Sequence, residues 1–187
     1  MSFFENTRKP VGLGGKLMVA MMNLGHSRGA RVALRVLTAA PLASGRDCGC
    51  GGGANMKRLL KKCPQGIVKG IDYSPVSVEK TKKVNETAIA EGRCAVLQGS
   101  VADMIFADDW FDAVTAFETV YFWPDLPQCF REVCRVLKPD GTFLICNESS
   151  GDTDKDEKWT EIIGGMTIYS GDELKTFLEN PGFCNGQ

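Results

Sequence analysis

Residues 47–54 read Asp-Cys-Gly-Cys-Gly-Gly-Gly-Ala, and a helical pattern follows them directly. The four glycines of this stretch let the backbone approach a ligand closely and adopt positive φ angles. Met56, Leu59, Leu60 and Cys63 then recur at the spacing of one apolar helix face. A glycine-rich turn that opens a helix presents free N–H groups and the positive end of the helix dipole to an anionic ligand group. The segment therefore predicts a ligand-binding loop.

An acidic residue stands at the end of the next predicted strand. The mostly apolar run Ile67–Ile71 leads to Asp72, which lies 21 residues after Gly51. In a doubly wound sheet, a carboxylate at the tip of the second strand binds the ribose of a nucleotide. The loop and Asp72 together predict a nucleotide site. Dinucleotide dehydrogenases and class I methyltransferases both use this arrangement, and the glycine pattern alone does not separate them.

Apolar runs alternate with helical patterns through the middle of the chain. The predicted strands after the glycine loop are 66–72, 95–97, 111–117 and 142–146. This alternation is typical of a parallel α/β sheet. The first strand of such a sheet should be apolar on both faces. Here no apolar residue lies between Ala43 and Cys48, so the first strand is expected to be poor.

The two ends of the chain differ in pattern and charge. Helical spacing over Leu13–Leu24 and Arg28–Ala40 predicts a helical arm before the sheet, and the acidic stretch 149–158 is expected to be a surface loop. Residues 1–40 hold six Lys or Arg and one acid, whereas residues 147–180 hold nine acids and three lysines. This asymmetry indicates two solvated faces or an arm that packs on the acidic end, with an acidic partner as the alternative.

The composition predicts one ordinary globular domain. The chain has 187 residues, of which 43% are hydrophobic and 24% are charged. A net charge of −1 gives no case for a nucleic-acid partner, and no apolar run is long enough to cross a membrane. Eight cysteines without a CxxC pair and a single histidine do not predict a metal site. They indicate a reducing compartment and a cytoplasmic location.

Four motifs occur in one order along residues 43–148: Asp47–Gly51, Gly70–Pro75, the strand from Phe111, and the turn Val136–Gly141. Together they resemble the class I S-adenosylmethionine (SAM) methyltransferases, and dehydrogenases do not carry such a turn at this place. The resemblance implies an α/β fold with a Rossmann-like, doubly wound, mostly parallel sheet. It also implies an N-terminal helical lid over residues 1–40 and a SAM-binding domain over residues 41–187.

The resemblance implies SAM as the cofactor and assigns ten residues to it: Asp47, Gly49, Cys50, Gly51, Asp72, Tyr73, Ser100, Val101, Glu118 and Thr119. The glycine loop would pass the methionyl part of SAM, and Asp72 would accept hydrogen bonds from both ribose hydroxyls. Tyr73, Ser100 and Val101 would meet the adenine. Glu118 and Thr119 would approach the sulfonium.

The implied function is transfer of a methyl group from SAM to a small-molecule acceptor. Because the methyl group leaves a sulfonium, the enzyme mainly aligns the reactants in a dry site. A base is needed only if the nucleophile arrives protonated, and His26 and Tyr121 are the candidate catalytic residues. Residues 121–123 are candidates to line an acceptor pocket. Two alternatives stay open: a non-catalytic SAM-binding protein, favoured by the poor first strand, and an NAD-dependent oxidoreductase.

The family resemblance also implies a missing part of the sheet. Family members build seven strands, of which the last two form an antiparallel hairpin. After Phe177 and Leu178, residues 182–187 suffice for at most the start of a sixth strand. The last strands are therefore expected to be missing, which leaves the fifth strand as an open edge. Such an edge favours pairing with another chain, so either a homodimer or an incomplete form of a longer enzyme is expected.

Overall fold

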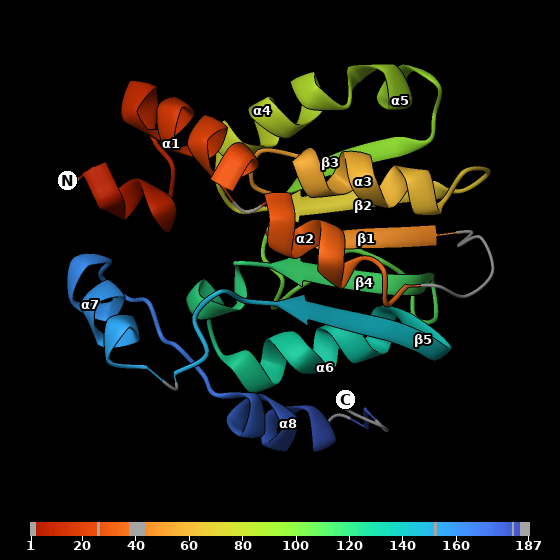
Figure 1. The fold of residues 1–187 in the computed structure, drawn as a ribbon. Helices are drawn as coiled ribbons and strands as arrows, with labels where there is room; N and C mark the ends of the chain where they lie inside the picture. The colour runs from red at the N-terminus through yellow and green to blue at the C-terminus, as the bar shows by residue number, and fades with distance from the viewer. Residues whose placement is uncertain (1–2, 26, 38–43, 152, 181, 184–187) are drawn as a thin grey trace.

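Five strands form one parallel sheet at the centre of the molecule (Figure 1). The computed structural model describes residues 3–25, 27–37, 44–151, 153–180, 182 and 183. The strands are β1 (Ser44–Cys48), β2 (Ile67–Asp72), β3 (Cys94–Gln98), β4 (Phe111–Phe117) and β5 (Leu137–Cys146). They lie in the order β3-β2-β1-β4-β5, and every pair is parallel. This confirms the predicted Rossmann-like sheet, with its change of direction between β1 and β4.

Helices cover both faces of the sheet and one of its ends. The helical elements are η1 (Phe3–Thr7), α1 (Gly12–Gly25), α2 (Ser27–Ala33), α3 (Ala54–Lys62), α4 (Pro75–Val84), α5 (Glu86–Ala90), η2 (Val120–Phe122), α6 (Leu126–Val136), α7 (Asp154–Ile162) and α8 (Gly171–Glu179). Helices α2 to α5 pack on one face through a core that includes Met56 and Leu59. Helix α6 packs on the other face through Val133 and Val136, and α8 packs against α6. Figure 1 shows η1, α1 and α7 at the end toward which the strand arrows point.

Strand β1 has no aliphatic residue, yet all five of its residues are buried. It pairs with β2 on one side and β4 on the other, so its backbone groups have partners along both edges. The Ser44 hydroxyl donates to the Trp110 carbonyl at 2.8 Å. Gly45 lets Leu59 approach, since a Cβ at Gly45 would lie 3.0 Å from Leu59 Cδ2. Backbone pairing on both edges therefore maintains a central strand that the apolar pattern alone predicted to be poor.

Arg46 is the least usual residue of β1. Its side chain is fully buried, and its guanidinium lies 4.1 Å from the centre of the Phe106 ring and 5.5 Å from that of Phe111. Within the described residues, none of its three side-chain nitrogens has a hydrogen-bond partner. Burial lowers the pKa of this guanidinium. Ring faces attract a cation but do not replace lost hydration fully, so Arg46 costs stability relative to an apolar residue.

Helix α2 ends at Ala33, so the prediction of a helix over Arg28–Ala40 was wrong in its length. The backbone N–H groups of Arg35 and Val36 donate to carbonyls three residues back rather than four. This tighter spacing commonly closes the last turn of an α-helix. Residues 38–40 lie outside the part of the chain that the structure describes.

Helix α7 takes the place of the second half of the loop that was predicted over residues 149–158. Thr153 stands at the N-cap of this helix, and acidic residues are favourable in the turn that follows. Trp159 of α7 meets Phe4 of η1 with ring centres 6.4 Å apart. The N-terminal arm therefore packs beside the acidic end of the chain, which is one of the arrangements that the charge asymmetry indicated.

Strand β5 forms one edge of the sheet. The turn predicted at residues 138–141 interrupts its ladder, because Asp140 has φ 63° and regular pairing resumes where Ala113 faces Thr142. No sixth strand occurs within the described residues, so the prediction of a shortened sheet with an open fifth strand is confirmed for them. A homodimer through this edge stays a prediction.

Candidate active site

A cavity of about 290 Å³ lies at the carboxyl ends of the central strands. Nine of the ten residues assigned to SAM by resemblance line this cavity: Gly49, Cys50, Gly51, Asp72, Tyr73, Ser100, Val101, Glu118 and Thr119. They come from the loops after β1, β2, β3 and β4. In open α/β sheets, ligands bind where such loops diverge at the change of strand direction. The structure therefore brings the predicted loop residues together around one space.

The glycine loop, residues 49–53, is fastened to the neighbouring strand and leaves no room for a side chain at Gly49, Gly52 or Gly53. The Gly49 N–H donates to the Ile71 carbonyl at 2.8 Å. Gly49 and Gly51 have φ angles of 72° and 51°, in the left-handed region. A Cβ at Gly49 would lie 2.0 Å from Thr119 Oγ1. Glycine at this position thus allows the loops after β1 and β4 to form adjacent walls of the cavity.

Asp72 joins the glycine loop to β2. Its Oδ2 accepts the Gly51 N–H at 2.9 Å, and its Oδ1 accepts the Ser74 N–H at 2.9 Å. The residue is buried yet lines the cavity, and burial raises the pKa of its carboxyl group. A carboxylate has about four acceptor positions; Gly51, Ser74 and the Ser77 side chain use three of them, so about one remains for a ligand. A hydroxyl group of a nucleoside ribose is a donor that can occupy it.

Asp47, the tenth residue assigned to SAM, is not part of the cavity lining. It is buried beneath the glycine loop, where it accepts a hydrogen bond from Thr115 Oγ1 at 2.9 Å. Burial raises the pKa of Asp47 to about 7. The structure therefore places Asp47 as a support under the loop.

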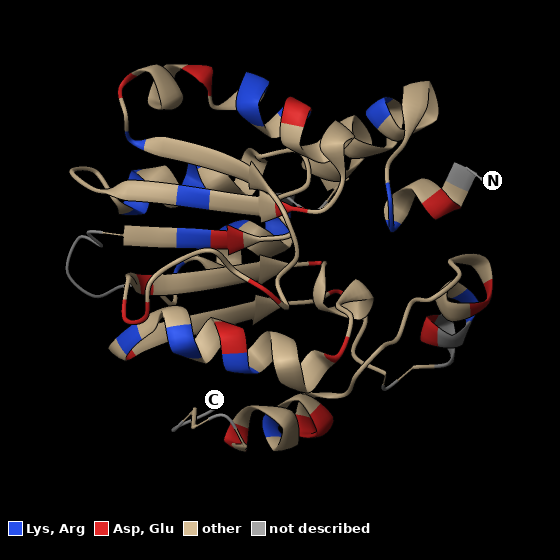
Figure 2. Cartoon of the chain, turned by 180° about the vertical axis from the view of Figure 1, so that it is seen from behind, with Lys and Arg blue, Asp and Glu red and all other residues tan. Residues whose placement is uncertain are grey.

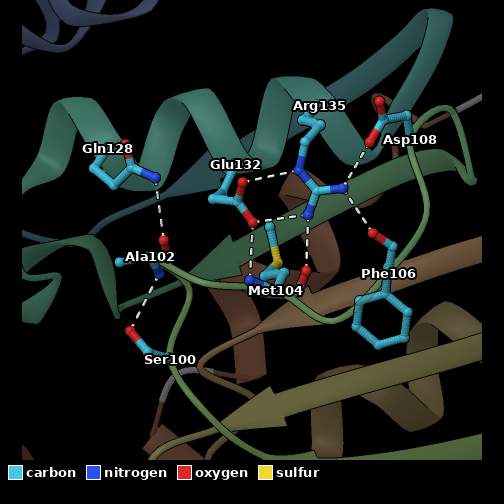
Figure 3. Close-up of polar contacts among 8 residues, drawn as sticks. All are labelled: Ser100, Ala102, Met104, Phe106, Asp108, Gln128, Glu132 and Arg135. Atoms are coloured by element: carbon cyan, nitrogen blue, oxygen red, sulfur yellow. Dashed lines mark hydrogen bonds and ion pairs between the residues drawn. The ribbon is translucent and has the colours of Figure 1, made fainter.

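The loop after β3, which carries the two predicted adenine contacts, is fastened to α6 (Figure 3). The Arg135 guanidinium donates to the carbonyls of Met104 and Phe106 at 2.7 and 2.6 Å. It also pairs with Glu132 at 2.8 Å, and Glu132 accepts the Met104 N–H at 2.8 Å. Hydrogen bonds to charged groups are stronger than neutral ones. Arg135 is thus a positioning residue for this wall.

Glu118 stands at the end of β4 in a conformation that few residues other than glycine adopt. Its φ angle is 55°, and such backbone strain tends to occur at functional sites. Glu118 lines the cavity, and burial raises its pKa to about 7. The Tyr121 hydroxyl donates to Glu118 Oε2 at 3.2 Å. A carboxyl group with this pKa can accept or release a proton at neutral pH.

Tyr121, one of the two predicted catalytic residues, is buried and is not part of the cavity lining. Its hydroxyl accepts the Ser149 N–H at 2.9 Å while it donates to Glu118. The next two residues, Phe122 and Trp123, line the cavity instead. The structure therefore gives Tyr121 a place behind Glu118, from which it orients the carboxyl group.

The N-terminal segment forms a wall that the sequence did not assign residue by residue. Its lining residues are Thr7, Arg8, Pro10, Val19, Met22 and Asn23. Asn23 Nδ2 donates to the Gly52 carbonyl at 2.9 Å, and Ser74 Oγ donates to the Pro10 carbonyl at 2.9 Å. The Tyr73 hydroxyl donates to the Arg8 carbonyl. His26, the other predicted catalytic residue, lies outside the described residues.

Backbone carbonyls have no signature in a sequence, which is why this wall was missed. The available signal was the helical spacing over Leu13–Leu24, which predicted the arm as an element, and Asn23 lies within it. In the described part of the chain, no group of three His, Cys, Asp or Glu residues is placed to hold a metal ion. None of the helices described there has both the length and the apolar character needed to cross a bilayer.

Known proteins that are similar to this chain include several methyltransferases. The methyltransferase domain family matches residues 46–145. Cycloartenol-C-24-methyltransferase 1 of Oryza sativa subsp. japonica is 32% identical over 99 residues, which are 53% of this chain and 28% of that protein. A chain in the complex of the Haloferax volcanii Trm112 methyltransferase activator with a methyltransferase has a TM-score of 0.81 at 26% identity. The match covers 88% of this chain and 72% of that one.

A SAM-dependent methyltransferase from Aquifex aeolicus shows the same fold, with a TM-score of 0.75 at 18% identity over 92% of this chain and 90% of that one. The chain spans about a third of the length of the sterol methyltransferases that it matches. The matched segment 46–145 includes the glycine loop, Asp72 and Glu118, and it covers more than half of the chain. The chain therefore belongs to the class I SAM-dependent methyltransferase family.

Proposed function

We propose that this chain binds SAM in the cavity and transfers its methyl group to a small apolar molecule. The observation that carries the proposal is Asp72, a carboxylate on the cavity wall that is bonded to the glycine loop through the Gly51 N–H and has acceptor capacity left for a ligand hydroxyl. Because Gly49 and Gly51 have no side chains, a ligand can approach the backbone of the loop closely. When bound, SAM supplies a methyl group on a positively charged sulfur, which is already activated for transfer.

The chain's own residues then hold the cofactor and exclude water. Asp72 would accept the ribose hydroxyls, and the glycine loop would pass the methionyl part, as the family resemblance implies. Ser100 and Val101, on the wall fastened by Arg135, would meet the adenine. Glu118 and Thr119 face the same cavity from the end of β4 and would stand near the sulfonium.

We also propose that residues 1–40 act as a lid and residues 41–187 as the SAM-binding domain. The contact between Asn23 and Gly52 supports this division, as do the bonds to the carbonyls of Arg8 and Pro10. A lid that excludes water strengthens electrostatic interactions in the site and prevents side reactions.

An apolar acceptor is supported by the chemistry of the cavity wall. Val19, Met22, Phe122 and Trp123 line it beside the polar loop residues. The matched relatives include proteins named as sterol methyltransferases. A nucleic-acid acceptor lacks support, because basic and acidic residues are interspersed along α4 and α6 (Figure 2) and the net charge is −1.

Glu118 is the proposed general base when the methylated molecule must lose a proton. Glu118 lines the cavity, and Tyr121 fixes the orientation of its carboxyl group by a hydrogen bond. His26 remains a predicted catalytic residue that the structure does not describe.

Calorimetry with SAM, S-adenosylhomocysteine and NAD tests the cofactor. We expect both SAM compounds to bind and NAD not to bind; NAD binding without SAM binding would contradict the proposal. Gly51→Val should abolish SAM binding because a β-branched side chain is strained at positive φ and would occupy ligand space. Gly171→Ala is the matched control, since a Cβ at Gly171 meets nothing within 4 Å.

Methyl transfer is then measured with labelled SAM and a panel of sterols and isoprenoids. Label in an extracted apolar product is the expected result. Saturable SAM binding without transfer to any acceptor would instead support a non-catalytic SAM-binding protein.

A further inference from the structure

Helix α1 has an apolar face that no described residue covers. Leu13, Leu17, Met21 and Leu24 are 86%, 56%, 52% and 79% exposed. Their spacing places them on one side of the helix. We call these four residues the α1 outer face. The opposite side of the helix, which includes Val19, is buried against the rest of the fold.

A helix that is apolar on both sides is normally buried on both sides. Lys16 is the only ionisable residue of α1, and Figure 2 shows the helix otherwise without charge. Lys16 pairs with Glu79 at 3.8 Å, and both side chains are largely exposed. Apolar surface gathered in this way marks an interaction site more often than it marks plain solvent exposure.

Beyond Glu79, which pairs with Lys16, the exposed charges that follow α1 along the chain are basic. Arg28, Arg31 and Arg35 are exposed in and just after α2, together with Val32 and Val36. Helix α1 contacts α2, and Arg28 lies four residues after Leu24, the last residue of the α1 outer face. Between Glu5 and Asp47 the sequence contains no acidic residue. Two copies of this surface would therefore bring like charges together, which disfavours self-association through it.

We propose that the α1 outer face docks on an anionic lipid surface, with Arg28, Arg31 and Arg35 against the headgroups. Apolar side chains beside basic ones are the composition of helices that lie in the plane of a membrane interface. The inner side of the same helix supplies Val19, Met22 and Asn23 to the cavity wall. Docking thus places the cavity beside the lipid. The proposal does not depend on methyl transfer.

Co-sedimentation of the full chain with vesicles tests this proposal. Vesicles of phosphatidylcholine with phosphatidylserine should bind the chain, vesicles of phosphatidylcholine alone should bind it weakly, and added salt should reduce binding. The double variant Leu17→Ser with Leu24→Ser should lose about tenfold or more in binding, because it removes buried apolar area. Arg28→Glu with Arg35→Glu should lose binding only to vesicles that contain phosphatidylserine.

Ile105→Ser is the matched control, since Ile105 is 79% exposed on the loop after β3, and it should bind vesicles as the parent does. Thermal melts and SAM titration show that each variant is folded. Absence of binding to phosphatidylserine vesicles would overturn the proposal, as would equal binding by parent and Leu17→Ser, Leu24→Ser. Light scattering that finds a dimer lost in that double variant would assign the face to a second copy and would also overturn it.

Discussion

Both oxygens of the Asp72 carboxylate already accept a backbone N–H group, from Gly51 and from Ser74. Asp72 is therefore a structural residue of the loop and a ligand residue at once. An asparagine in its place keeps one acceptor oxygen, whereas an alanine keeps none. The two substitutions separate the structural role from the ligand role.

Asp72→Ala should weaken SAM binding by ~2–3 kcal/mol, because the hydrogen bonds from the ribose to a charged acceptor are lost. Asp72→Asn should weaken binding less. Calorimetry gives the affinities, and thermal melts show how far the loop is destabilised. SAM binding by Asp72→Ala with the affinity of the parent would show that the ribose does not lie at the tip of β2.

Glu118 sets the expected pH dependence of turnover. Its pKa is raised to about 7 by burial, and a proton acceptor must be ionised to act. The rate of methyl transfer to an acceptor that loses a proton should therefore rise with pH and level off above about 7. Glu118→Gln should remove this limb and lower the rate by about 10²–10⁴-fold. A pH–rate profile of parent and variant measures both effects; an unchanged limb in the variant would assign it to another group.

At the scale of elements, the sequence predicted those parts that have a local signature. Ser74 caps α4, Asp125 caps α6, and Ser170 with Glu173 forms a capping box on α8, and each of these caps is a local residue pattern. Cap residues make their hydrogen bonds within a few positions of themselves, so a single sequence reveals them.

Elements that depend on distant partners were predicted less well. Strand β1 is formed by pairing with β2 and β4 rather than by its own apolar residues. Helix α7 was missed, and α2 was predicted too long. The lid contacts to the carbonyls of Arg8 and Pro10 involve no side chain on the lid itself. The site residues on the loops after the strands could be predicted from the sequence, whereas the individual lining residues of the N-terminal segment could not.

Arg135 connects α6 with the loop after β3, and its removal should affect both. Arg135→Ala leaves the carbonyls of Met104 and Phe106 without this donor. We expect a loss of about 1–3 kcal/mol in the free energy of unfolding and weaker SAM binding. Urea unfolding and calorimetry measure the two effects.

Arg131→Ala on the same helix is the control, because Arg131 is exposed and its guanidinium donates to Gln128 of its own helix. It should change neither quantity by much. Equal effects of the two substitutions would show that the contact with the loop is unimportant.

For the molecule as a whole, the buried carboxyl groups of Asp47, Asp72 and Glu118 make stability fall as pH rises. Burial raises the pKa of Asp47 from 3.8 and of Glu118 from 4.5, both to about 7. In the folded chain these groups hold their protons at pH values where the unfolded chain has released them. Their contribution to stability is therefore complete below the unfolded pKa values and is lost as pH rises through about 7.

Asp47→Asn should flatten this dependence, since an amide does not titrate and its oxygen can still accept the Thr115 hydroxyl. Urea unfolding of the parent between pH 4.5 and 7 should show stability falling with pH, and the variant should show a smaller fall. Asp103→Asn is the control, because Asp103 is exposed. A slope unchanged in Asp47→Asn would show that Asp47 is ionised in the folded chain.

The bonds from Tyr73 and Ser74 to the N-terminal segment carry a consequence for the timing of turnover. These two residues directly follow Asp72, so a molecule bound to Asp72 lies behind a clasp that must open before it departs. Exit of the spent donor, rather than the transfer step, is then the slow event of each cycle, as in many enzymes with closing loops. Tyr73→Phe, which removes one bond of the clasp, should turn over faster and release its donor sooner. A burst of product in the first turnover of the parent, reduced in the variant, would be the kinetic sign of this clasp.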